Sequence, residues 1–148
     1  MEPITAIGLL ASVAQLLEVT VKLIRYVNGI KKAPQSRVAL AIEATALLGL
    51  LTSLKYRVEQ AETEHDSWYD GIQSLAGKHG PLEQLGTEMA VLNSRLQPKR
   101  GGSLTWPFSE SYIKDTLTKI ERLKTHVGLA LQSDHLQALS FLLFKRNS

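Results

Sequence analysis

Apolar and polar side chains alternate with a helical period along almost the whole chain. The first stretch of this kind runs from about Ile4 to about Ile30, and no charged side chain lies between Ile4 and Leu17. It carries two apolar stripes, Leu10, Val13, Leu17, Val21, Ile24 and Val27, and Leu9, Leu16, Leu23 and Ile30. A helix that is apolar nearly all round belongs at the centre of a bundle or in lipid. We therefore expect this helix to be the most buried one, although its uncharged part is shorter than the ~20 residues of a membrane span.

The turn at Ala33-Pro34 separates this stretch from a second helix, predicted from Gln35 or Ser36 to about Glu62. Its core stripe consists of Ala44, Leu47, Leu51, Leu54 and Val58. A row of small residues also runs along it, at Ala41, Thr45, Gly49 and Ser53. Small side chains allow another backbone to approach closely, in soluble bundles and in membranes. We expect this row to pack against the first helix.

Two further helices are predicted in the middle of the chain. A short one opens at Ser67 and ends near Gly77, with Trp68, Ile72 and Leu75 on one side. A long one runs from Pro81 to about Gln97 and is stopped by Pro98. Its apolar stripe consists of Leu82, Leu85, Met89, Leu92 and Leu96.

The stretch from Pro98 to Pro107 reads as a loop, and we expect Trp106 and Phe108 to dock on the bundle as structural anchors. Ser109 is a suitable N-cap for the last helix. That helix carries Ile113, Leu117, Ile120, Leu123, Val127 and Leu131, and the pattern continues through Leu136, Leu139 and Leu142. A break is allowed around Ser133-Asp134.

These patterns predict an all-α chain: an antiparallel helical bundle of about four long helices plus a short helix near 67–77. We assign residues 1–138 to the bundle and residues 139–148 to a C-terminal extension or truncated linker. The length of 148 residues fits one domain with a real core.

Composition narrows the chemistry. The absence of cysteine excludes disulfides, thiolate catalysis and cysteine-based metal sites. The net charge of +3 permits attraction to anionic lipid or nucleic acid without requiring either. Because acidic Glu2 stands where a signal peptide has basic residues, we expect an intracellular protein.

Four sets of residues resemble chemical motifs only weakly. The segment Gly71 to Lys78 has one residue too many for a phosphate-binding loop, and His79 replaces the required Ser or Thr. The other sets are a polar cluster (Glu62, Glu64, His65, Asp66), two single histidines (His126, His135) and a mixed-charge helix face (Lys114, Lys119, Arg122, Lys124). Nucleic-acid binding needs a denser basic patch with aromatic residues. We expect no enzyme, no catalytic, cofactor or metal site, and no nucleic-acid partner.

Four segments in this order and spacing resemble the HeLo-like N-terminal domain of fungal NLR-like (STAND) proteins. They are the opening helix from Pro3-Ile4 to Tyr26, and Ala33-Pro34 followed by Arg37 and the run Leu47 to Leu54. The others are Gly80-Pro81-Leu82-Glu83-Gln84-Leu85, and Trp106-Pro107-Phe108-Ser109 with Ile120 to Lys124 and Leu129 to Gln132. The resemblance extends to about Ala138. Domains of this kind look related to the HeLo domain of fungal incompatibility proteins. They are also similar to the helical bundle of the mixed-lineage kinase domain-like pseudokinase and to plant resistance helical domains.

The resemblance implies a membrane-targeting, pore-forming-type effector of fungal programmed cell death, in heterokaryon incompatibility and innate immunity. It implies activation through clustering by an upstream NLR-like sensor, self-assembly, and movement from the cytoplasm to the plasma membrane. The expected insertion residues are Ile4, Ile7, Gly8, Leu9, Leu10, Ser12, Val13, Leu16 and Leu17. The expected contacts to anionic lipid are Lys22, Arg25, Lys31, Lys32 and Arg37.

Two alternatives stay open from the sequence. The chain is either a membrane-permeabilising effector or a soluble helical adaptor, an oligomerisation module of an NLR-like signalling protein. In contrast to that family, no nucleotide-binding region follows the bundle, so we expect either a fragment of a longer protein or a short stand-alone protein.

Overall fold

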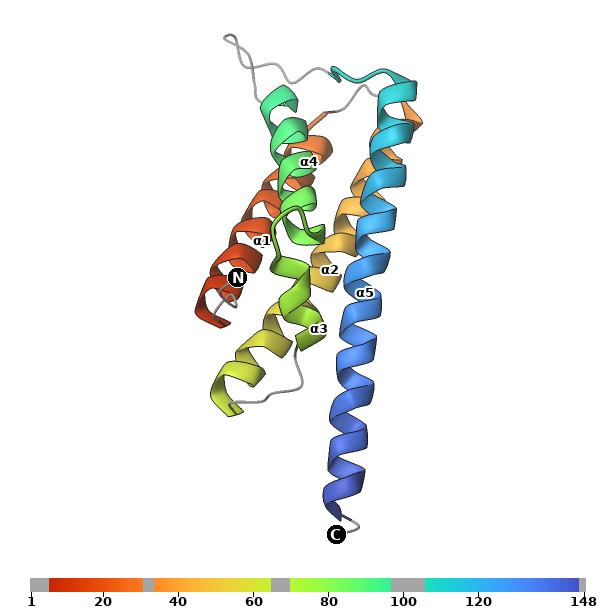
Figure 1. Ribbon diagram of the computed structural model, residues 1–148. Coiled ribbons are helices and arrows are strands. Elements are labelled where there is room, and N and C mark those ends of the chain that lie inside the picture. The colour runs from red at the N-terminus through yellow and green to blue at the C-terminus, as the bar shows by residue number, and fades with distance from the viewer. Residues whose placement is uncertain (1–5, 31–33, 65–69, 97–105, 147–148) are drawn as a thin grey trace.

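The computed structural model describes residues 6–30, 34–64, 70–96 and 106–146. Its elements are α1 (Ala6–Asn28), α2 (Gln35–Glu64), α3 (Asp70–Gln73), the 3-10 turn η1 (Ser74–Ala76), α4 (Pro81–Leu96) and α5 (Glu110–Arg146). Every regular element in these ranges is helical, which confirms the predicted all-α bundle (Figure 1). Trp68 and the loop residues 97–105 lie outside the described part.

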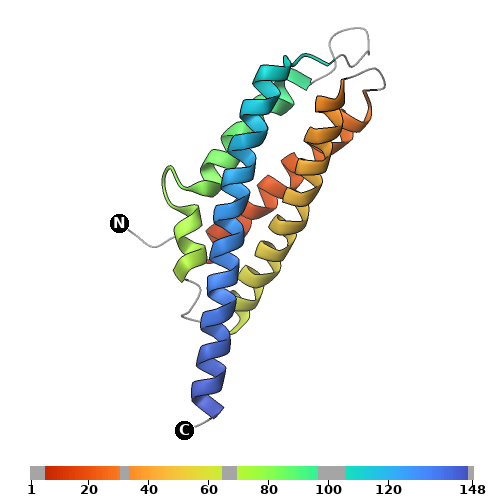
Figure 2. The same ribbon diagram turned by 90° about the vertical axis from the view of Figure 1, so that its right-hand side faces the viewer.

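The four long helices run alternately up and down. α1 packs mainly on α2 and α4, and α5 packs on α2, α3 and α4. The first turns of α1 and the last turns of α5 therefore lie toward the same end of the bundle (Figures 1 and 2). At that end α5 extends beyond the other helices (Figure 2).

The core is built from the apolar stripes that the helical period predicts. The predicted stripes of α2 and α4 are buried at every position, and so are Ile72 and Leu75 of the short helical segment. α1 contributes Leu9, Val13, Leu16, Leu23 and Val27 from one face. At roughly 1.5–3 kcal/mol for each large apolar side chain, this burial is the main stabilising contribution.

The expectation that the first helix is the most buried one is wrong. α4 buries six of its 16 residues, whereas α1 buries six described residues of a 23-residue helix. α1 lies against two helices only on its inner side, so its outer face stays open to solvent. Over its first three turns this outer face carries short or uncharged polar side chains, and exposed charges follow from Glu18 onward.

The expectation that the row of small residues in α2 packs against the first helix is also wrong. Thr45, Gly49 and Ser53 are exposed, and no atom lies within 4 Å of a Cβ placed on Gly49. The hydroxyls of Thr45 and Ser53 donate to carbonyl oxygens of their own helix, at 2.8 and 3.2 Å. α2 contacts α1 through its larger side chains, because those side chains bury more apolar area.

α5 has no break around Ser133-Asp134 and runs continuously from Glu110 to Arg146. Asp134 is fully buried, and its carboxylate accepts hydrogen bonds from Nε and Nη2 of Arg57, whose side chain is 13% exposed. A polar residue that suggested a helix break from sequence is thus a buried ion-pair partner. The pair joins α2 to α5 close to the point where α5 leaves the bundle.

Phe108, one of the two predicted anchors, packs at the start of α5. Its ring is buried and stacks on Tyr112, with ring centroids 5.4 Å apart. Trp106 meets Phe108 edge to face at 5.1 Å and is half-buried. The guanidinium of Arg95 lies 4.8 Å from the Phe108 ring and donates to the carbonyl of Pro107 at 3.0 Å. Ser109 caps α5, since its Oγ accepts a hydrogen bond from the Tyr112 amide at 3.1 Å.

The Arg57–Asp134 pair predicts a large cost for a single substitution. Asp134→Ala removes the buried carboxylate that pairs with the largely buried guanidinium of Arg57 and should lower the free energy of unfolding by up to about 3–5 kcal/mol. The double variant Arg57→Met with Asp134→Leu should recover most of this loss, since neither side chain then needs a partner. Urea unfolding followed by circular dichroism measures both. The control is Lys55→Ala, whose exposed pair with Glu59 should change stability by less than about 0.5 kcal/mol.

The aromatic cluster predicts unequal costs for its two rings. Phe108→Ala should cost about 3–5 kcal/mol because the ring is buried, and half-buried Trp106→Ala should cost less. The same unfolding experiment compares them. Equal stability of Phe108→Ala and the parent chain would contradict the anchoring role.

Candidate membrane-contact surface

The predicted insertion residues of α1 divide between two faces. Leu9, Val13 and Leu16 are buried, and Gly8, Leu10 and Leu17 are half-buried. Ser12 is exposed. Ile4 and the side chain of Ile7 lie outside the described part. Of the seven predicted insertion residues whose burial is described, three are therefore buried, three are half-buried and one is exposed.

The outer face of α1 is uncharged over its first three turns. Its exposed side chains there are Ala11, Ser12, Ala14 and Gln15, and the first exposed charge is Glu18. Surface helices of soluble bundles normally place charged residues on the face opposite the core. The twelve residues from Ala6 to Leu17 therefore form a cylinder without charge, about 18 Å long at 1.5 Å per residue.

The predicted lipid-contact cations lie at or beyond the opposite end of α1. Lys22 and Arg25 are exposed, and Lys31 and Lys32 lie outside the described residues. Arg37 is half-buried, and its Nη1 lies 3.5 Å from the carbonyl oxygen of Val27 in the last turn of α1. A cation near a helix C-terminus is favoured by the helix dipole, so Arg37 has a structural role in the closed bundle.

Polar contacts fix the middle of α1 to α4. Asn93 is buried and donates from Nδ2 to the carbonyl oxygen of Val19 at 3.1 Å. Next to it, the buried hydroxyl of Thr20 donates to the Leu16 carbonyl of its own helix at 2.6 Å. The hydrogen bond from Asn93 to Val19 therefore helps to hold α1 in register with α4.

Two grooves run beside α1. The larger, with a volume of about 470 Å³, lies between α1 and α4 and is lined by residues such as Ser12, Gln15, Leu82, Gly86 and Ala90. Gly86 leaves room on the α4 side, where a Cβ would make an ordinary van der Waals contact with the side chain of Leu16 at 3.6 Å. The smaller, of about 380 Å³, lies between α1 and α2. It is lined by Leu17, Glu18, Val21, Lys22, Arg25 and Leu48. Both are open troughs, but they differ in chemistry, because small and apolar side chains predominate in the larger one, whereas Glu18, Lys22 and Arg25 line the smaller one.

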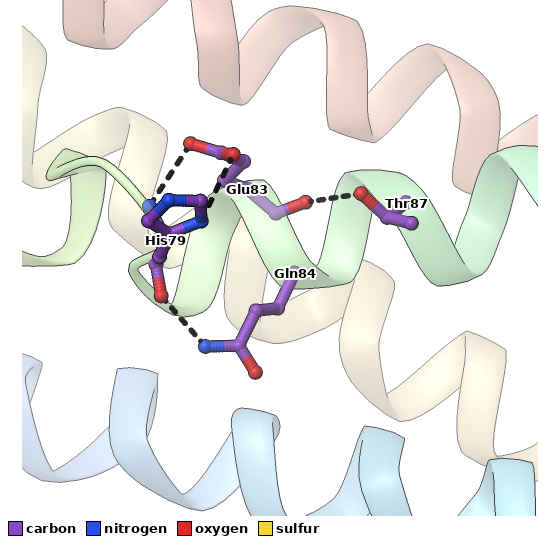
Figure 3. A network of polar contacts seen from close by, with 4 residues as sticks. All are labelled: His79, Glu83, Gln84 and Thr87. Carbon is purple, nitrogen blue, oxygen red and sulfur yellow. Dashed lines mark hydrogen bonds and ion pairs between the residues drawn. The ribbon is translucent and has the colours of Figure 1, made fainter.

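The polar network at the start of α4 serves the helix end (Figure 3). The amide of His79, which has a positive φ of 61°, donates to the Glu83 carboxylate at 3.1 Å. The Gln84 side chain donates to the His79 carbonyl at 2.8 Å. These contacts cap the helix. Gly71 to Ala76, the centre of the weak phosphate-loop resemblance, forms α3 and η1 instead of a loop after a strand.

The described residues contain no group of three or more His, Asp or Glu side chains that could hold a metal ion. The cluster at Glu62, Glu64, His65 and Asp66 lies outside the described side chains. His126 and His135 are exposed on α5.

The sequence reasoning missed the outer face of α2. By length and composition, Gln35–Gln60 is the one segment of the described chain that is long and apolar enough to cross a membrane, a test that core helices also pass. Only 28% of its most apolar window is buried, so much of this helix faces outward. The exposed positions there are uncharged from Val38 to Ser53. The missing charge at outward positions was a visible signal in the sequence.

No protein-family model, curated protein or solved structure matches the chain.

Proposed function

We propose that the chain is a membrane-targeting, pore-forming-type effector of fungal programmed cell death that is activated by clustering. In its resting form α1 stays in the bundle in the cytoplasm. When an upstream NLR-like sensor brings several copies together at the plasma membrane, α1 leaves the bundle and enters lipid. The resemblance of the four sequence segments supports the biological setting, and the geometry of α1 supports the mechanism.

The observation that carries this proposal is the uncharged outer face of α1. Its inner face is apolar because it packs in the core, as in any bundle. An outer face of Ala11, Ser12, Ala14 and Gln15 has no such explanation. Each charged residue at the centre of a membrane-inserted helix costs about 2.5–3.5 kcal/mol. The first three turns of α1 carry no such cost on either face.

The length of the uncharged part limits how far α1 enters. About 18 Å is roughly half of the ~30 Å hydrocarbon core. A single α1 therefore reaches to about the middle of the bilayer, while Lys22 and Arg25 stay among the headgroups. Each basic residue there contributes about 1 kcal/mol on an anionic surface. Perforation then requires several copies, and Gly8-x-x-x-Ser12 offers a small-residue row for their assembly.

The energetics explain why a trigger is required. The buried apolar side chains that the release of α1 must uncover belong to α1 and to Ile30, two residues after its end: Leu9, Val13, Leu16, Leu23, Val27 and Ile30. Exposing all six to water would cost roughly 10–20 kcal/mol, comparable to or greater than the ~5–15 kcal/mol that stabilises a typical domain. Release in water is therefore negligible. Lipid covers the same surface again, so the open state becomes accessible only at a membrane.

The grooves beside α1 favour a second function, a soluble helical adaptor. A trough of about 470 Å³ lined by small and apolar residues suits an amphipathic helix of another protein. In that case α1 stays in the bundle and the uncharged face of Ser12 and Gln15 belongs to the partner site. The two functions differ in whether α1 moves.

The variant Ala11→Glu with Ala14→Glu separates folding from insertion. Both positions are exposed in the bundle, so the fold and its stability should stay near those of the parent chain. In lipid the two charges should cost about 5–7 kcal/mol together. We expect loss of dye release from phosphatidylserine-containing vesicles and loss of toxicity when the chain is fused to a forced-oligomerisation tag.

The control is Ala46→Glu, a single Ala-to-Glu substitution on the exposed face of α2, compared with Ala11→Glu and Ala14→Glu made singly and together. It should leave dye release intact. If Ala46→Glu abolished release and the α1 variant did not, α2 would be the inserting helix. If the α1 variant killed cells as well as the parent chain, the adaptor function would replace the effector function. Two further variants test the residues that flank α1 by the same dye release. They are Lys31→Glu with Lys32→Glu, and removal of Met1–Pro3 with Ile4→Asp. Both should stay folded by circular dichroism and lose dye release.

A further inference from the structure

The end of α5 displays a concentration of exposed apolar side chains. Among the large apolar side chains that are exposed in the described chain, five lie within nine consecutive residues at the end of α5: Leu136, Leu139, Leu142, Leu143 and Phe144. Phe144 is 77% exposed, the highest value among them. Apolar clusters of this kind on a soluble bundle mark contact sites for a partner or a membrane.

The cluster is exposed because the bundle ends before α5 does. The row of α5 side chains that faces the core is buried at Ile120, Leu123, Val127 and Asp134. Beyond Asp134 the corresponding position is half-buried Ala138, and the helix continues to Arg146. The last turns of α5 project past the other helices (Figure 2). The Arg57–Asp134 pair holds the base of this projection.

The projection is also cationic. Between Asp134 and the end of α5 at Arg146 there is no acidic residue, whereas Lys145 and Arg146 stand in the last turn of the helix. Both are exposed, directly after Leu142, Leu143 and Phe144. An apolar tip with adjoining basic residues complements the boundary of an anionic bilayer, where acyl chains meet negatively charged headgroups.

The distribution around the helix favours a bilayer over a second copy of the chain. Leu136, Leu139, Leu142 and Leu143 follow one broad row at spacings of three and four residues, whereas Phe144, the most exposed of the five, lies on another side of the helix. A paired helix covers only a narrow seam of a and d positions, so it would leave Phe144 in water. Two cationic tips side by side would also repel each other. Lipid surrounds the tip and supplies the opposite charge.

We propose that the end of α5 is a second, separate lipid contact that docks the closed bundle on an anionic bilayer. Leu142, Leu143 and Phe144 enter the boundary between headgroups and acyl chains, and Lys145 and Arg146 bind lipid phosphates. This docking needs no movement of α1. The first turns of α1 lie level with the middle of α5, so docking by the tip and insertion of α1 are separate steps (Figures 1 and 2).

Vesicle co-sedimentation of the full chain, without clustering, tests the docking. The parent chain should bind vesicles of phosphatidylcholine with phosphatidylserine more tightly than vesicles of phosphatidylcholine alone. Leu143→Ser with Phe144→Ser should lower the partition coefficient by about tenfold or more. Lys145→Glu with Arg146→Glu should remove the preference for phosphatidylserine, again by about tenfold or more.

Two matched controls carry the same substitutions on other exposed surfaces. Val38→Ser with Ile42→Ser changes apolar residues of α2, and Lys114→Glu with Arg122→Glu changes basic residues of α5 within the bundle. Both should bind like the parent chain, and all variants should keep its circular dichroism and thermal unfolding. Equal loss in a tip variant and its control would overturn the proposal, because binding would then follow overall composition.

Unchanged vesicle binding of the tip variants would also overturn it. If they instead lost self-association in analytical ultracentrifugation, a second copy would be the occupant of the tip. The α1 variant Ala11→Glu with Ala14→Glu keeps the two proposals apart. It should dock normally and fail to release dye. If it docked normally and still released dye, α1 insertion would be wrong while docking by α5 would stand.

Discussion

The structure depends on covering the inner face of α1. Leu9, Val13, Leu16, Leu23 and Val27 can be removed from water only by α2 and α4, the helices that α1 packs against. Asn93 adds one buried hydrogen bond to α1 and fixes its register without adding much to its attachment. The attachment is therefore mostly apolar and non-directional. An interface of that kind is strong in water and replaceable by lipid, which is the property that the proposed effector needs.

The other side of the bundle is held differently. α5 is joined to α2 through the buried Arg57–Asp134 pair and to α4 through the core and an exposed pair between Lys119 and Glu88. A buried ion pair has no equivalent partner in lipid, because each charge would have to leave the other in an apolar medium. We therefore propose that α2, α4 and α5 stay together as a scaffold when α1 leaves the bundle.

Much of this fold follows from the sequence. The apolar stripes of α2 and α4 are buried as the helical period predicts. Residues at this spacing lie on one face of a helix, and in both helices that face lies toward the core. The errors come from information that no local pattern contains. Asp134 suggests a break until Arg57, 77 residues away, supplies its partner. The small residues Thr45, Gly49 and Ser53 permit close packing, but the direction that they face depends on which side of α2 the larger side chains bury. The outer face of α1 has no charged residue over its first three turns, and the sequence therefore predicts its burial. The structure shows that this face is exposed, so the absence of charge does not by itself indicate burial.

The position of α1 in the membrane-bound state can be measured directly. The chain has no cysteine, so spin labels can be placed at Ala14→Cys on α1 and Ser94→Cys on α4, both exposed positions. A second pair, Ser53→Cys on α2 and Gln132→Cys on α5, reports on the scaffold. Pulsed electron paramagnetic resonance gives the two distances in solution and after clustering on phosphatidylserine-containing vesicles. The α1–α4 distance should increase on the vesicles while the α2–α5 distance stays the same. Dye release from those vesicles with an unchanged α1–α4 distance would contradict the release of α1.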